Sequence, residues 1–142
     1  MLIATAAVFF ALGYIISTTI NKSNDEQSHI SCPDTEEFME FLNSFNDDIR
    51  FQKERTLFPL LYSTFSNETD DTIDTFLIES AGWMPLEIFT TENAAVIIRQ
   101  APDDPCKITV TLRGINTGEY AVFTFIAEKG IWRLHSFGDY SD

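Results

Sequence analysis

The stretch FNDDIRFQKERTLFPLLY, residues 45–62, passes from closely spaced charges to an apolar run within a few positions. Asp47 or Asp48 can cap a short helix that carries the charged residues on a solvated surface. The apolar run is typical of a strand, and Pro59 requires an edge position or a bend there because it has no N–H to donate. We therefore expect a helix that leads directly into the first strand of a sheet.

Another helix is expected just before this stretch. Its apolar residues recur at i, i+3, i+4 and i+7, and they are Phe38, Phe41, Leu42 and Phe45. This spacing places them on one helical face. Asp34 is in position to cap the helix, with Glu37 as its partner in a capping box. The one-sided stripe predicts a helix that packs on a sheet.

The second half of the chain is rich in β-forming residues. The β-rich runs are residues 94–100, 106–114, 119–128 and 131–137, and short turns separate them. Short connections predict consecutive antiparallel strands. Residues 73–80 are compatible with a strand or a short helix. Helices first and strands later indicate an α+β fold, with a curved antiparallel sheet packed on the N-terminal helices.

The chain divides into three parts by composition. Residues 1–20 are uncharged and mostly apolar, residues 21–33 form a polar linker, and residues 34–142 form a single domain. The first part is interpreted as an uncleaved membrane anchor, as a degenerate or cleaved export signal, or as a core helix. The first two interpretations place the domain in the cell envelope, outside the cytoplasm, and the anchor would make the membrane a partner.

The net charge of the chain is −13. Such an acidic protein lacks the basic surface that neutralises phosphates, so a nucleic acid is excluded as a partner. Cys32 and Cys106 are expected to pair if the domain is exported, and the alternative is two free thiols. A bridge between them would stabilise the fold by about 4 kcal/mol in the chain-entropy model. Neither a zinc-binding spacing nor a calcium loop is found, so no metal or cofactor is expected.

Residues of the opening stretch carry a family resemblance. The matching positions are Phe41, Phe45, Asp48, Phe51, Gln52, Arg55, Phe58, Pro59 and Leu60. This pattern resembles a family of uncharacterised bacterial envelope proteins, catalogued as domain of unknown function 4348. The closing run GIWRLHSFGDYS, residues 130–141, is also similar to that family. The resemblance implies the nuclear transport factor 2 fold, in which a curved sheet wraps around helices and often forms a pocket. It implies no activity.

Strand alternation suggests one binding site. The basic residues that would share the polar face of the sheet are Arg99, Arg113, Arg133 and His135. Together they would bind a carboxylate or a phosphate, because guanidinium groups hold such anions with paired hydrogen bonds. The alternative is a solvated sheet face whose bases pair with nearby acids. A dyad of His135 with Asp139 or Glu79 is a further hypothesis.

These observations leave three functions open. The first is a non-catalytic, envelope-associated binding module for a small ligand or an envelope protein. The second is a small enzyme that uses the cone pocket, with His135 as acid or base and the arginines holding an anionic substrate. The third is a structural or assembly protein.

Overall fold

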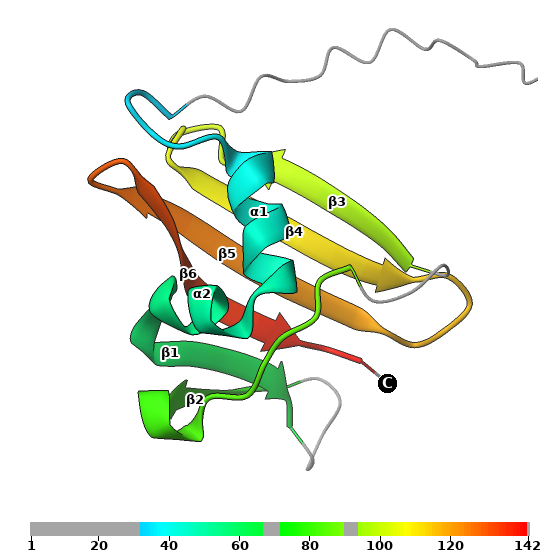
Figure 1. Cartoon of the computed structure of the whole chain (residues 1–142). Helices are drawn as coiled ribbons and strands as arrows, with labels where there is room; N and C mark the ends of the chain where they lie inside the picture. The colour runs from blue at the N-terminus through cyan, green and yellow to red at the C-terminus, as the bar shows by residue number, and fades with distance from the viewer. Residues whose placement is uncertain (1–31, 67–71, 90–93, 142) are drawn as a thin grey trace, which may run out of the picture.

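The computed structural model describes residues 32–66, 72–89 and 94–141 (Figure 1). Two helices lie on one face of a six-stranded sheet. The elements are α1 (Phe38–Asp47), α2 (Ile49–Glu54), β1 (Thr56–Phe65), β2 (Ile73–Ile78), the short 3-10 helix η1 (Ser80–Gly82), β3 (Ala94–Gln100), β4 (Lys107–Gly114), β5 (Tyr120–Glu128) and β6 (Ile131–Asp139). The predicted α+β class is confirmed.

The expected N-terminal anchor or signal, residues 1–20, lies outside the described residues, as does most of the linker. In the described part of the chain, no helix is long and apolar enough to span a bilayer.

The strand order is β2-β1-β6-β5-β4-β3. Strands β3 to β6 form the antiparallel meander that the short turns predicted. The sheet as a whole is mixed, however, because β1 pairs with β6 in parallel. The helices cause this difference: α2 delivers the chain beside β6, where Leu134 N donates to Arg55 O at 2.8 Å.

Pro59 lies inside the sheet. β1 is flanked by β2 and β6, so the expected edge position is wrong. Within β1, Pro59 lies in an irregular stretch, since the register against β6 shifts between Thr56 and Leu61 and pairing with β2 begins at Leu60. A proline is accommodated there because it falls where the ladder is interrupted.

The helix caps agree only in part with the expected ones. Asp48 caps α2, accepting hydrogen bonds from Arg50 N at 2.8 Å and Phe51 N at 3.2 Å. Glu37, and not Asp34, caps α1 through a 2.7 Å bond from Glu40 N. Asp34 instead has a φ of 54° and forms a turn before the helix. The helix therefore begins later than the capping-box pattern indicated.

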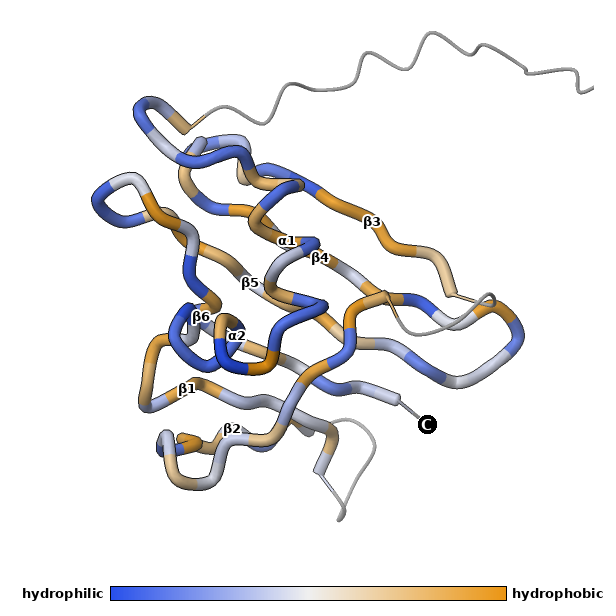
Figure 2. The backbone as a smooth tube through the Cα atoms, in the orientation of Figure 1, coloured by the Kyte–Doolittle hydropathy of each residue, from blue (hydrophilic) through white to orange (hydrophobic). Residues whose placement is uncertain are grey.

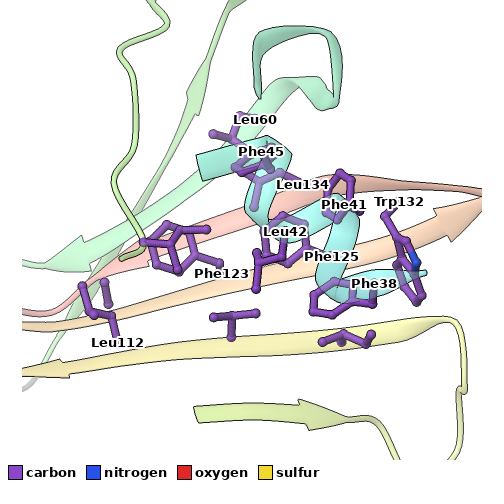
Figure 3. Close-up of a cluster of buried hydrophobic side chains, with 14 residues drawn as sticks. Phe38, Phe41, Leu42, Phe45, Leu60, Leu112, Phe123, Phe125, Trp132 and Leu134 are labelled. Atoms are coloured by element: carbon purple, nitrogen blue, oxygen red, sulfur yellow. The ribbon is translucent and has the colours of Figure 1, made fainter. Parts of the chain in front are cut away.

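The core lies between α1 and the sheet (Figure 3). The predicted stripe of α1 is buried, and its rings meet aromatic side chains of β5 and β6. Phe38 lies edge-on to Trp132 with ring centres 5.1 Å apart, and Phe45 meets Phe125 at 5.3 Å. Figure 2 shows the contrast between the apolar strands and the hydrophilic turn that joins β5 to β6. The edge-to-face contacts of these aromatic rings stabilise the core beyond what the burial of apolar surface alone contributes.

An ion pair joins the chain before α1 to α2 and β6. The Arg55 guanidinium binds the Glu36 carboxylate and also donates to Trp132 O at 3.2 Å. Trp132 N donates to Glu36 Oε1 at 2.8 Å. Burial raises the pKa of Glu36, but the hydrogen bonds from Arg55 and Trp132 and the charge of Arg55 outweigh it and hold the pKa below its ordinary value.

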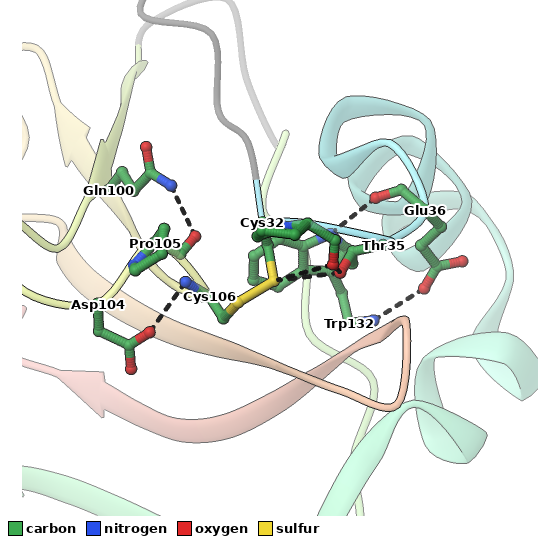
Figure 4. The surroundings of a disulfide bond; sticks show 9 residues. Cys32, Thr35, Glu36, Gln100, Asp104, Pro105, Cys106 and Trp132 are labelled. Atoms are coloured by element: carbon green, nitrogen blue, oxygen red, sulfur yellow. Dashed lines mark hydrogen bonds between the residues drawn. A yellow bond between two sulfur atoms is a disulfide. The ribbon is translucent and has the colours of Figure 1, made fainter.

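Cys32 and Cys106 form a disulfide (Figure 4). Their Cα atoms are 4.8 Å apart, and the bridge joins the start of the domain to the residue before β4. The Asp104 carboxylate accepts from Cys106 N at 2.9 Å, which orders the loop that carries this cysteine. The bridge thus attaches the chain ahead of α1 to the sheet.

Candidate ligand pocket

A cavity of about 520 Å³ opens between the sheet and residues 83–89, which we call the crossing segment. In Figure 1 this segment runs across the front of the sheet after η1. The lining residues are Pro85, Leu86, Glu87, Leu112, Glu119, Tyr120, Ala121, Phe123, Phe137, Asp139 and Ser141. The cavity is therefore built from the crossing segment, from β4, β5 and β6, and from residues that flank those strands.

Two polar side chains of the helices hold the crossing segment in place. Gln52 donates to Leu86 O at 2.7 Å and accepts from Leu86 N at 2.8 Å. Asn46 Oδ1 accepts from Ile88 N and from Phe89 N, each at 3.0 Å. Side chains thus bind four backbone groups of the segment, in place of a strand partner.

The wall on the sheet side is aromatic. Phe123 on β5 stacks on Phe137 of β6 with ring centres 5.0 Å apart. Phe137 stacks in turn on Tyr62 of β1 at 5.5 Å. The register places these residues opposite one another on the face that carries the helices. Because the rings stack on one another and Phe123 is buried, they offer an apolar wall rather than open ring faces, and such a wall accepts an apolar group.

Three carboxylates join the aromatic wall: Glu87, Glu119 and Asp139. Asp139 accepts from Ser141 N at 3.1 Å, and Glu119 accepts from the Thr117 hydroxyl at 3.3 Å. None of the described lining residues is basic. Within the described ranges, no group of three or more His, Cys, Asp and Glu side chains is arranged to hold a metal. The cavity thus combines an apolar surface with negative charge.

The structure does not bring the four predicted basic residues together. Arg113 lies at the end of β4, beside Tyr120 of β5. Arg133 on β6 pairs with Ile126, whose other neighbour is Lys107. Arg113 and Arg133 are thus separated by six residues along the sheet, or about 20 Å. Their side chains share one face, opposite the buried Leu112 and Trp132.

Arg99 and His135 are also outside the cavity. Arg99 on β3 lies opposite Thr109 and borders a separate depression beside Pro102 and Pro105. His135 is exposed at the register shift between β5 and β6. Among the described residues no carboxylate is within hydrogen-bonding contact of His135, so the hypothetical dyad with Asp139 or Glu79 is not formed.

Sequence reasoning missed most of the cavity. Of its acids only Asp139 was considered, and in a different role. The signal was present in residues 119–128, where alternation puts Ala121, Phe123 and Phe125 on one face. The part of the chain that packs against these side chains depends on where residues 83–89 cross the sheet. The irregular sequence of that segment does not predict its path.

Several solved structures resemble this domain, among them the following two. One is a nuclear transport factor 2-like protein from Bacteroides fragilis, with 22% identity and a TM-score of 0.60, and the match covers 79% of this chain and 50% of that one. The other is a protein from Bacteroides uniformis, with 21% identity, a TM-score of 0.51 and coverage of 75% and 78%. This chain thus spans about half the length of the first neighbour.

No family model and no curated protein matches the chain. The resemblance to domain of unknown function 4348 therefore stays a prediction. The likeness to the first of these structures shows the fold alone: this is an α+β domain with a nuclear transport factor 2-like fold, with an open six-stranded sheet and a cavity on its helix side.

Proposed function

We propose that the protein is a non-catalytic binding module whose cavity takes a small ligand with an apolar body and a positively charged group, such as an amine. The observation that carries this proposal is the lining, in which an aromatic wall meets three carboxylates and no base among the described residues. The volume of about 520 Å³ is in the range of small-molecule sites.

The charge of the whole protein supports the same ligand class. A net charge of −13 attracts cations and repels anions at long range. Within the cavity a cation would meet Glu119 and Asp139 on the strand side and Glu87 on the crossing segment. An aromatic or aliphatic body would then rest on the Phe123–Phe137 stack.

The proposed location is the cell envelope. The apolar stretch of residues 1–20 supports an anchor or an export signal, and a disulfide suits an oxidising compartment. The domain would then face outside the cytoplasm, where its ligand is a small solute. An envelope protein is the alternative partner.

The enzyme hypothesis receives less support from this geometry. Its acid or base, His135, and its anion-binding arginines line no part of the cavity. The enzyme hypothesis also requires an anionic substrate, whereas the lining of the cavity favours a cationic ligand.

The test compares two ligands of similar shape and opposite charge on the full chain in mild detergent. We expect phenethylamine to raise the melting temperature and to bind in calorimetry, while phenylacetate does neither. Glu119→Gln should weaken amine binding about tenfold, the size expected for one charged contact. Glu54→Gln, an exposed acid on α2, is the matched control and should leave binding unchanged.

Either of two results would overturn the proposal. One is stronger binding of phenylacetate than of phenethylamine. The other is an equal loss of amine binding in Glu54→Gln and Glu119→Gln, because that would assign the effect to net charge and not to the cavity.

A further inference from the structure

The edge strand β2 exposes apolar side chains on both faces of the sheet. Ile73 and Leu77 are 57% and 64% exposed on the outer face, and Phe76 is 52% exposed on the helix face. The other edge strand differs, since β3 packs Val96 and Ile98 against the core. Edge strands of native proteins usually carry lysine, proline or a bulge against pairing. β2 has none of these, and its single charge is Asp74.

The backbone of β2 also has an unused side. Among the described strands, β2 pairs with β1 alone. Ser66 N donates to Thr72 O at 2.8 Å, so the alternation of an antiparallel ladder directs residues 74, 76 and 78 toward β1 as well. The N–H and C=O groups of Ile73, Thr75 and Leu77 consequently point to the edge of the sheet.

We propose that β2 pairs antiparallel with β2 of a second copy, across a two-fold axis at Thr75. Thr75 then lies opposite the partner's Thr75, and Ile73 lies opposite the partner's Leu77. Every outward N–H and C=O of these three residues finds an acceptor or a donor in this register. The sheet continues through both copies, and the dimer is closed because the contact is the same from both sides.

The sequence of β2 favours a second copy as the occupant. The outer face of the junction pairs Ile73 with the partner's Leu77 twice, around a central threonine pair, and such cross-strand pairs are stabilising. Asp74 lies opposite the partner's Phe76, so the two aspartates do not face each other. An axis at Phe76 would instead place Thr75 opposite the partner's Leu77 and leave Ile73 without an apolar partner.

The net charge of the protein determines how dimerisation should depend on salt concentration. Two copies of −13 repel each other, and the junction itself is almost uncharged. Salt screens the repulsion, so association should strengthen as the salt concentration rises. A basic protein or peptide on the same edge would respond in the opposite direction.

The register is tested by cross-linking the full chain in mild detergent micelles. Cys32 and Cys106 are joined in the structure, so an introduced cysteine supplies the free thiol. Under mild oxidation, Thr75→Cys should form a covalent dimer, and Ile73→Cys mixed with Leu77→Cys should form a mixed dimer. Thr111→Cys, in the middle of β4 on the same face, is the control and should stay monomeric.

A second measurement follows the native interface by sedimentation in the same detergent. Leu77→Lys should weaken dimerisation about tenfold or more, because the dimer contains the affected pair twice. Met84→Lys, which changes an apolar side chain 74% exposed on the crossing segment, should have no effect.

Failure of the proposal would be clear from these data. It is overturned if Thr75→Cys stays monomeric, if Thr111→Cys dimerises as readily, or if added salt dissociates the dimer. Amine binding by the cavity is measured separately, so neither result decides the other.

Discussion

Gln52 is a polar side chain inside the core, 1% exposed, and every hydrogen bond of its amide goes to the backbone. It donates to Phe45 O at 3.0 Å and exchanges two bonds with Leu86. It therefore joins the end of α1 to the crossing segment and sets one wall of the cavity. This contact explains the presence of a glutamine in the motif without any catalytic role.

Replacing Gln52 tests this role. Gln52→Ala should lower the free energy of unfolding by about 3 kcal/mol, because it leaves buried backbone groups of Phe45 and Leu86 without partners. Lys53→Ala, on the exposed side of the same helix, should change it by less than about 0.5 kcal/mol. Urea unfolding measures both. Similar values for the two variants would contradict the structural role of Gln52.

Glu36 makes stability depend on pH. Its pKa lies below the ordinary value of 4.5 in the folded protein, owing to Arg55 and Trp132, despite the opposing effect of burial. A lowered folded pKa gives stability that is present above the unfolded pKa and is lost as pH falls through the folded pKa. We therefore expect Glu36 to contribute near neutral pH and to cease contributing in acid.

Glu36→Gln measures this dependence. The variant should melt at a lower temperature than the native protein at pH 7, and the difference should shrink as pH falls below 4.5. Glu54→Gln controls for the loss of one negative charge. A difference between native and Glu36→Gln proteins that stays constant from pH 7 into acid would reject the assigned role of the ion pair.

At the scale of elements, the fold depends on a few connections between pieces that lie far apart in the chain. The disulfide joins the segment before α1 to β4, over a sequence separation of 74 residues. The ion pair joins that segment to α2 and β6. Both connections hold α1 against the sheet, where its phenylalanine rings form the core.

Removing the disulfide should be costly for this reason. We expect Cys32→Ser/Cys106→Ser to lose about 4 kcal/mol of stability in the chain-entropy model of a long closed loop. Denaturant unfolding with and without reductant measures the loss. Reductant should lower the stability of the native protein and leave the double variant unchanged. Thiol titration of the folded native protein that finds two thiols would contradict the bridge.

At the scale of the whole molecule, the negative net charge has opposite effects on ligand binding in the cavity and on dimerisation at β2. The net charge of −13 should favour a cation in the cavity and oppose pairing of two copies at β2. Added salt should therefore weaken amine binding and strengthen dimerisation. A common direction for both would contradict at least one of the two proposals.

Local features of this protein were predictable from sequence alone. Residue periodicity and turns of a few residues predicted the stripe of α1, the strand after Arg55 and the meander of β3 to β6. They also predicted a cap for α2 at Asp47 or Asp48, and the structure shows that it is Asp48. These patterns lie within short stretches of sequence, so they can be recognised without knowing how the rest of the chain folds. The family resemblance pointed to the fold that the first structural neighbour shows.

Only the tertiary structure decided the remaining features. These features are the parallel pairing of β1 with β6, the interior position of Pro59, the lining of the cavity and the exposure of β2. Each depends on contacts between residues that are far apart in sequence. Alternation correctly placed the arginines on one face, but their separation along the sheet depends on strand register. The strand register and the path of residues 83–89 across the sheet depend on which apolar surfaces pack together. Alternative packings compete over the whole chain, so no short stretch of sequence decides between them.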